Sequence, residues 1–330
     1  KDEEEVFPRL QTALNFLQNA DRFHGAWPHW MNGATGDVIP FFEKDNGGDI
    51  VETAFLCQAL ICIREKYKNG NSIEQALATQ ADNLYRGVEW DWYTNGQNVM
   101  IWHWSPQYNF EINNQLRGYN EALIVYVLAA ASPTHPISSA VYNEGWSRNG
   151  GIASGASKFG IPVILDHAGA SGSVGPMFFS HYSFLALDPT GLSDGYVNYG
   201  QAVINHAKIQ HKYSVLNPNG WSGYNDKVWG LTASESRNED GSIGYWAHSI
   251  ESDKGVISPT AAISSLPYAY DEAIKFLKYA YEENPTKLVG ECGPYDAFSP
   301  KYDWYVKRYL AIDQGTIAPM IENYRTGLLW

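Results

Sequence analysis

Cysteine is scarce in this chain, which has only Cys57, Cys62 and Cys292 among its 330 residues. Their spacing fits no metal-binding motif, and their number neither demands nor excludes an oxidising compartment. Basic residues are also few, since 23 Lys and Arg stand against 36 Asp and Glu, for a net charge of -13. Because a phosphate backbone requires a basic surface, this balance argues against nucleic-acid binding. No uninterrupted apolar stretch is long enough to span a membrane.

Several catalytic motifs are missing as well. The string nearest to a nucleophile elbow, residues 151–155, reads GIASG and lacks the required order. The chain has no GxxxxGK phosphate loop, no HExxH and no CxxC. We therefore expect neither a metal nor a cofactor. The chain begins with Lys1 rather than Met and shows no signal peptide, so we expect an N-terminal segment to precede it.

What the sequence does contain is helical periodicity over most of its length. Helices are predicted at residues 6–17, 50–67, 73–86, 122–131, 178–187, 196–212, 259–265, 271–282, 301–310 and 314–324. Residues 88–104 carry a weak strand pattern with a turn near Asn95, which predicts a hairpin there. Residues 145–175 are rich in glycine and predict a long loop. No low-complexity linker divides the chain, so residues 1–330 are predicted to form one all-α domain.

The predicted helices are of two kinds. Residues 122–131 are apolar nearly all round, which is typical of a helix buried on every side, whereas residues 271–282 are amphipathic and charged. Alternation of the two kinds predicts an inner and an outer ring of helices, the arrangement of an (α/α) toroid. In such a barrel, the loops at one end form the pocket.

The segment FFEKDNGGDIVE places Asp45, Asp49 and Glu52 around a pair of glycines at the start of a predicted helix. The simplest interpretation is a capping box formed by Asp49 and Glu52. A functional interpretation is that the glycine turn brings Asp45 close to the other two acids. Because three neighbouring carboxylates cannot all ionise at low cost, at least one pKa should rise, as a general acid requires. A calcium site is a third interpretation, although the spacing matches no calcium loop.

Two further acids precede apolar helices. Glu121 lies before residues 122–131, and Asp313 lies before residues 314–324. Ordinary helix capping, favoured by the helix dipole, is again the simplest interpretation of both. If these helices are interior, however, their first residues face a cavity rather than bulk water, and an acid in that position needs a partner or a chemical role.

Aromatic residues make up 14% of the chain, with 12 Trp and 22 Tyr. A large aromatic core accounts for most of them, and the remainder suits stacking against sugar rings. The candidate sugar-binding residues are Trp102, His103, Trp104, His181, Tyr182, Trp221, Tyr224, Trp229, Gln314, Glu322 and Arg325. Glu322 and Arg325 also have the spacing of an ion pair on a helix. Acids at helix starts among aromatic loops favour a glycoside hydrolase.

Seven strings extend this argument, in order from Gly47 to Trp330: GGDIVETAFL, GYNEALIVYVLAAASPTHPI, FFSHYSFLALDP, WGLTAS, ISPTAAISSLPY, YDAFSP and IDQGTIAPMIENYRTGLLW. With these strings the sequence resembles the bacterial glucoamylase-like family that contains glycoside hydrolase family 144, the β-1,2-glucanases and sophorose-releasing enzymes. The resemblance implies an (α/α)6 barrel and hydrolysis of β-1,2-linked glucose. It also implies a periplasmic or otherwise exported protein, as in gut Bacteroidetes-type bacteria.

The family acids carried over by these motifs are Asp45, Asp49, Glu52, Glu121 and Asp313. Members of the family usually carry further N-terminal sequence that supplies the first barrel helices, so this chain is expected to lack its first helix or helices. WGLTAS is followed here by Glu235, where many relatives have an Asp-Gly pair. This difference leaves the preferred oligosaccharide open.

We predict an inverting mechanism, in which two carboxyl groups lie roughly 6.5–9.5 Å apart. Glu121 is the preferred acid and Asp313 the preferred base, with the reverse assignment left open. Asp49, with Asp45 and Glu52, tunes the pocket or carries a proton through water. Two alternatives remain open: an α-glucan hydrolase of the glucoamylase type, and a carbohydrate-binding barrel without catalysis. A polysaccharide lyase is less favoured because its uronate substrates call for a basic groove. The expected partner is an oligo- or polysaccharide.

Overall fold

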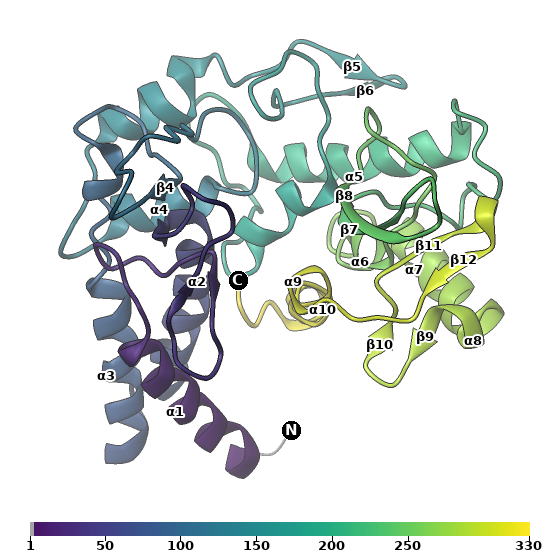
Figure 1. The fold of residues 1–330 in the computed structure, drawn as a ribbon. Helices are drawn as coiled ribbons and strands as arrows, with labels where there is room; N and C mark the ends of the chain where they lie inside the picture. Colours follow the sequence, from purple (N-terminus) through teal and green to yellow (C-terminus); the bar gives the residue numbers. More distant parts are fainter. Residues whose placement is uncertain (1–2) are drawn as a thin grey trace. The chain divides into compact units, whose positions relative to one another are not determined.

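The computed structural model describes residues 3–330 (Figure 1). Helices are its main regular elements. They are α1 (Glu3–Asn19), α2 (Ile50–Tyr67), α3 (Ser72–Arg86), α4 (Leu123–Ala131), α5 (Tyr199–Leu216), α6 (Pro259–Ile263), α7 (Tyr270–Lys278), α8 (Pro285–Leu288), α9 (Ala311–Gln314) and α10 (Ile317–Thr326). None of these described helices has both the length and the apolar composition needed to cross a lipid bilayer.

The named strands are short and pair only as antiparallel two-stranded sheets. The pairs are β1 (Trp30–Met31) with β2 (Val38–Ile39), β3 (Gly48–Asp49) with β4 (His103–Trp104), β5 (Ser157–Lys158) with β6 (Ile161–Pro162), β7 (Ala233–Arg237) with β8 (Ile243–Ala247), β9 (Val289–Gly290) with β10 (Gly293–Pro294), and β11 (Ala297–Ser299) with β12 (Trp304–Val306). The described chain is therefore a largely helical protein with small ribbons in its loops.

Three predictions of local structure are wrong. Residues 178–187 form two short 3-10 turns, Met177–Ser180 and Tyr182–Phe184, instead of one helix. Residues 301–310 contain strand β12, because Trp304, Tyr305 and Val306 favour a strand and pair with β11. The hairpin expected within residues 88–104 is replaced by the pairing of β4 with β3. That pairing joins segments far apart in the sequence, which local periodicity cannot reveal.

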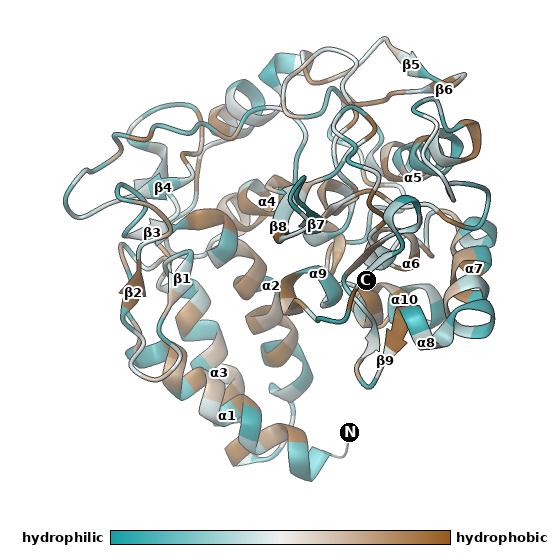
Figure 2. Ribbon diagram, turned by 45° about the vertical axis from the view of Figure 1, so that its right-hand side comes forward, coloured by the Kyte–Doolittle hydropathy of each residue, from teal (hydrophilic) through white to brown (hydrophobic). Residues whose placement is uncertain are grey.

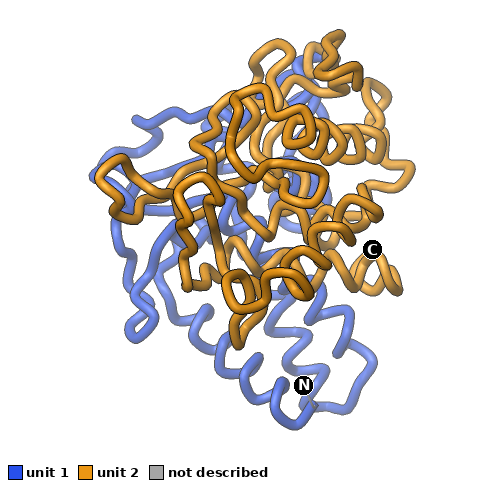
Figure 3. The backbone as a smooth tube through the Cα atoms, turned by 90° about the vertical axis from the view of Figure 1, so that its right-hand side faces the viewer, with its two compact units in different colours: residues 1–117, 122–149 blue, residues 118–121, 150–330 orange. Residues whose placement is uncertain are grey.

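The described chain divides into two compact units (Figure 3). Unit 1 comprises residues 3–117 and Ala122–Asn149, and unit 2 comprises Gly118–Glu121 and Gly150–Trp330. Four residues within the unit 1 part of the chain therefore belong to unit 2, and Glu121 is the last of them. The helix that follows, α4, belongs to unit 1. No linker marks this division in the sequence, and the single domain over residues 1–330 stays a prediction.

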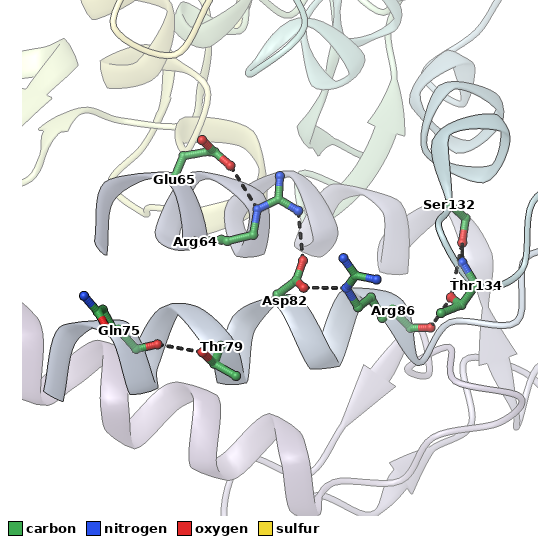
Figure 4. Close-up of polar contacts among 8 residues, drawn as sticks. All are labelled: Arg64, Glu65, Gln75, Thr79, Asp82, Arg86, Ser132 and Thr134. Atoms are coloured by element: carbon green, nitrogen blue, oxygen red, sulfur yellow. Dashed lines mark hydrogen bonds and ion pairs between the residues drawn. The ribbon is translucent and has the colours of Figure 1, made fainter. Parts of the chain in front are cut away.

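In unit 1, helix α2 packs against α3 and α4. Helix α4 is hydrophobic over most of its length (Figure 2), and its side chains are mostly buried. On the outer side, Arg64 of α2 lies 2.9 Å from Asp82 of α3, and Asp82 also contacts Arg86 (Figure 4). Because partly exposed ion pairs contribute about 0–1 kcal/mol each, apolar burial is the main stabilising term between these helices.

In unit 2, the core lies around helices α6 and α7. It includes the fully buried Trp229, Phe276 and Phe298, with Ile257 and Ile263 packed among them. Burying a large apolar side chain contributes about 1.5–3 kcal/mol. This core provides a rigid base for the loops and strands that carry the polar residues of unit 2.

Candidate active site

Asp49 is the centre of a buried polar cluster in unit 1. As the N-cap of α2, its Oδ1 accepts hydrogen bonds from the backbone N–H groups of Val51 (2.9 Å) and Glu52 (3.0 Å). Its Oδ2 accepts hydrogen bonds from His29 Nδ1 and from Trp102 Nε1, both at 2.9 Å. Asp49 is therefore the predicted N-cap, through one of its two oxygens, but the predicted capping box with Glu52 is not formed, because the Asp49 N–H donates to the carbonyl of Trp27 at 2.9 Å. The other oxygen connects the helix start to two side chains from distant loops.

Asp45 and His103 complete this cluster. The β3–β4 pairing places His103 directly opposite Asp49, with its Nε2 3.8 Å from Asp49 Oδ2. The same Nε2 lies 3.3 Å from Asp45 Oδ2. Asp45 is buried, and its Oδ2 has no hydrogen-bond partner within residues 3–330. The structure thus brings Asp45, Asp49 and Glu52 together, as the glycine turn predicted.

Burial and neighbouring charges shift the pKa values of four side chains in this cluster and bring those of two carboxyl groups close to neutrality. Burial, and then the charge of Asp49, raises the pKa of Asp45 to about 6 and that of Glu52 to about 7. Burial lowers the pKa of His29, but the hydrogen bond and the charge of Asp49 outweigh it, so the net shift is upward. Burial lowers the pKa of His103. The expected rise of at least one carboxyl pKa is therefore found, and several groups of this cluster can bind or release a proton near neutral pH.

The same residues are those that could hold a metal ion. His29, Asp45 and Asp49 each offer one ligand atom, and these atoms lie within 4.8 Å of one another. Imidazole and carboxylate ligands suit Zn²⁺ better than Ca²⁺, which takes six to eight oxygen ligands. Because His29 and Asp49 are hydrogen-bonded to each other, an ion would have to replace that bond. The absence of a metal requirement remains a prediction.

Unit 2 contains a second carboxyl cluster, formed around Asp313 of α9. The Tyr245 hydroxyl donates a hydrogen bond of 2.8 Å to Asp313 Oδ1, and the Asp296 carboxyl group lies close enough to affect the pKa of Asp313. Asp313 Oδ2 and Asp296 Oδ1 are both buried and have no donor among the described residues. A protonated carboxyl group is itself a donor, so protonation of one of these acids supplies a donor that the described residues do not.

This pairing has a strong electrostatic effect. Burial, and then the charge of Asp296, raises the pKa of Asp313 to about 8, and burial raises the pKa of Asp296. The backbone N–H of Glu235 donates to Asp296 Oδ2 at 2.7 Å, and Arg308 contacts the Glu235 carboxylate at 3.0 Å. Asp313 therefore holds a proton at neutral pH, and Asp296 is the neighbouring carboxyl group whose charge favours that proton.

Glu121 lies in a turn two residues before α4 and belongs to unit 2. The Ser183 hydroxyl donates to the backbone carbonyl of Glu121. The hydroxyl of the preceding residue, Tyr182, donates to the backbone carbonyl of Ile312 at 3.2 Å. Two consecutive residues of one 3-10 turn thus anchor the backbone at Glu121 and the residue before Asp313. This is the structural link between the two acids assigned to catalysis.

Some predicted sugar-binding residues lie at these clusters and others do not. Trp102 and His103 belong to the unit 1 cluster, and Trp104 packs its edge against His24 at 4.7 Å. Tyr182 anchors the Asp313 segment, as described above. The Gln314 side-chain amide donates to the carbonyl of Pro294.

Three of these predictions are corrected by burial. Trp229 is 0% exposed, with its indole N–H bonded to the carbonyl of Glu272, so it has no free face for a sugar. Tyr224 lies in the same core and donates to Asp253 at 2.9 Å. His181 is buried against Ser265, and burial lowers its pKa to about 3. A large aromatic core was the expected alternative for Trp and Tyr residues, and it applies to Trp229 and Tyr224.

The remaining predicted residues have other surroundings. Trp221 is half-buried against the unit 2 core, with the Lys301 ammonium 4.4 Å from its ring centre. Glu322 and Arg325 form an ion pair of 3.1 Å on the outer face of α10, as their spacing predicted. Each of these three side chains therefore has a contact within the protein, and none of these contacts points to sugar binding.

Sequence reasoning missed His29, Tyr245 and Asp296. Asp296 lies inside the string YDAFSP, which was used only for the family resemblance. His29 and Tyr245 carry no local signal, because their importance comes from hydrogen bonds to acids at a distance in the chain.

Comparisons with known proteins show the family to which this chain belongs. A family model named Glycoamylase, described as "Putative glucoamylase", matches residues 113–330, so the chain belongs to this glucoamylase-like family. The exo beta-1,2-glucooligosaccharide sophorohydrolase (non-reducing end) of Parabacteroides distasonis is 37% identical over 352 residues, which are 99% of this chain and 47% of that protein. The chain therefore spans about half the length of this curated relative.

Solved structures are also similar to this chain. The endo-beta-1,2-glucanase from Chitinophaga pinensis, in complex with sophorotriose and glucose, has a TM-score of 0.96 and 49% identity, covering 100% of this chain and 78% of that one. The beta-1,2-glucanase from Parabacteroides distasonis has a TM-score of 0.92 and 36% identity, covering 100% of this chain and 49% of that one.

Proposed function

We propose that this protein hydrolyses β-1,2-linked glucose in β-1,2-glucan and sophoro-oligosaccharides, on an (α/α)6 barrel. The names of the similar proteins support the substrate class, and the predominance of helices supports the barrel. The observation that carries the proposal is the anchoring of Glu121 and the Asp313 segment by Ser183 and Tyr182. A glycosidase needs two carboxyl groups held in a fixed relation to each other, and this turn supplies such a link within unit 2.

The proposed reaction inverts the anomeric centre. The Glu121 carboxyl group gives its proton to the glycosidic oxygen as the bond from that oxygen to the anomeric carbon breaks. A water molecule attacks the same carbon from the opposite face and loses a proton to the Asp313–Asp296 pair, whose negative charge accepts it. Because this pair already holds one proton, the charge that acts as base is shared between two carboxyl groups.

In this proposal, the unit 1 cluster is a sugar-binding site of its own, whose acids form hydrogen bonds to sugar hydroxyl groups. Asp45 and Glu52 have pKa values near neutrality, so each can donate or accept a hydrogen bond according to its protonation. Trp102 and His103 border these acids, and each combines a flat ring with polar ring N–H or N groups. Such a mixture of flat rings and polar groups is typical of a carbohydrate site.

The test is product analysis of the purified protein on β-1,2-glucan, sophorose and soluble starch. The variants are Glu121→Gln and Asp313→Asn, with Asp271→Asn on the charged helix α7 as a matched control. We expect glucose or sophorose from the wild type and the control, and losses of at least about 100-fold in both test variants. The anomer of the first product, followed by NMR, should be inverted.

Other outcomes identify the alternatives. Cleavage of starch alone would replace the proposal with an α-glucan hydrolase. Binding of β-1,2-glucan without turnover would replace it with a carbohydrate-binding barrel. We also propose, on the family resemblance, that the protein is exported. Fractionation of the producing cells tests this, and recovery of the protein only with the cytoplasm would contradict it.

A further inference from the structure

Three aromatic side chains of unit 1 are unusually exposed. Trp30 is 52% exposed, Phe41 is 43% exposed and Phe42 is 49% exposed. They are nevertheless close to one another, since the ring centres of Trp30 and Phe41 are 4.7 Å apart and those of Phe41 and Phe42 are 5.5 Å apart. We call these three residues the aromatic platform. Leaving such large apolar groups in water is costly, so a contiguous exposed patch indicates a binding surface.

The platform adjoins the unit 1 carboxyl cluster. The Phe41 ring lies 4.2 Å from the ring of His29, whose Nδ1 is hydrogen-bonded to Asp49. The Phe42 ring lies 6.4 Å from the ring of His103, which contacts Asp45. Apolar faces and buried hydrogen-bonding groups thus follow each other without a break. This order matches a sugar, whose ring has apolar C–H faces and a polar rim of hydroxyl groups.

The ring directions also indicate what kind of ligand fits. The planes of Trp30 and Phe41 are 80° apart, and those of Phe41 and Phe42 are 57° apart. One flat apolar surface cannot cover rings that face such different directions. A chain of separate pyranose rings can, because each sugar turns relative to the next and stacks on its own aromatic neighbour.

We propose that Trp30, Phe41 and Phe42 form a subsite on unit 1, beside its carboxyl cluster, that binds glucosyl units of a long β-1,2-glucan chain. This inference rests on the proposed function and deepens it, because it assigns residues that select polymer over short oligosaccharides. Binding energy from glucosyl units that do not react lowers KM for the polymer and leaves the chemical step unchanged when it is equal in the ground state and the transition state.

The test compares Trp30→Ala and Phe41→Ala with the wild type on two substrates, polymeric β-1,2-glucan and sophorotriose. We expect KM for the polymer to rise about tenfold in each variant while kcat stays within about twofold. The kinetics on sophorotriose should be unchanged. Trp30→Phe keeps a flat ring and should restore most of the lost affinity. Tyr270→Ala removes a 45% exposed aromatic from α7 and serves as the matched control.

Affinity electrophoresis of each variant in gels containing β-1,2-glucan separates this inference from the proposed function. Weaker retention of Trp30→Ala and Phe41→Ala supports the subsite even if the wild type shows no turnover. If the wild type cleaves the polymer and both variants match it in KM and retention, the subsite is wrong and the proposed function stands. If the variants instead change only the oligomeric state, measured by light scattering, the platform is a protein contact and the inference is also wrong.

Discussion

His29 Nδ1 lies 2.9 Å from Asp49 Oδ2, and the ring centre of the same imidazole lies 4.2 Å from that of Phe41. His29 thereby joins the buried carboxyl cluster to the exposed aromatic platform. Asp49 in turn caps α2, so a change at His29 reaches both the helix start and the surface.

Replacing His29 with Ala should lower stability and activity together. Asp49 is fully buried and would keep only Trp102 as a side-chain donor, and loss of a hydrogen bond to a charged group costs about 1.5–3 kcal/mol. Urea unfolding should show a loss in this range. His24→Ala, which removes a half-buried His paired with Glu89, is the control. A His29→Ala variant as stable as the wild type would show that the 2.9 Å contact contributes nothing.

The carboxyl pair in unit 2 predicts how stability depends on pH. The folded protein raises the pKa of Asp313 from its ordinary value of 3.8 to about 8, so the folded state binds this proton more tightly than the unfolded state. The resulting stabilisation is fully present below about pH 4 and is lost as the pH rises through about 8. Asp313→Asn should remove this part of the pH dependence between pH 4 and 8, as measured by denaturant unfolding at several pH values. An unchanged profile would contradict the raised pKa.

The same pair predicts the pH dependence of catalysis. If Asp313 acts as base, loss of its proton near pH 8 strengthens the base, so kcat should hold or rise through this range. Asp296→Asn removes the neighbouring charge, which should lower the pKa of Asp313 and move this inflection to lower pH; burial still acts, so the shift is incomplete. A fall in kcat through about pH 8 would instead assign Asp313 as the acid and Glu121 as the base.

Metal removal should leave activity unchanged, because no step of the proposed mechanism uses an ion. Dialysis against EDTA followed by the β-1,2-glucan assay tests this. Added Zn²⁺ should inhibit, since His29, Asp45 and Asp49 can converge on an ion in place of their own contacts. EDTA should reverse the inhibition. Loss of activity after EDTA, restored by a divalent cation, would contradict the metal-free mechanism.

Two tryptophans should separate stability from function. Trp229→Ala removes a fully buried core side chain and should cost about 3–5 kcal/mol of unfolding free energy, with little change in the kcat of the folded fraction. Trp102→Phe removes the indole donor to Asp49 and should reduce activity more than stability. Equal effects of both changes on kcat would show that the hydrogen bond from Trp102 to Asp49 does not contribute to activity.

Part of this fold could be predicted because its signals are local. The predicted helix at residues 73–86 corresponds to α3, which has the capping box of Asn71 and Glu74 and a clear apolar face. Asp49 was recognised because it precedes an apolar helix as an N-cap, and it is one. By contrast, the residues 301–310 have helical spacing, but Trp304–Val306 pair with a neighbouring strand, and tertiary context overrides the pattern.

The acids of the candidate site were therefore determined by the sequence itself, through helix-start patterns and the family strings that contain Asp45, Asp49, Glu52, Glu121 and Asp313. Tertiary structure alone decided their chemistry. It set His29 and His103 beside one acid cluster, paired Asp296 with Asp313, and enclosed Trp229 in the core. The reason is physical: a helix start depends on the few residues around it, whereas the pKa of a carboxyl group depends on burial and on charges supplied by distant parts of the chain.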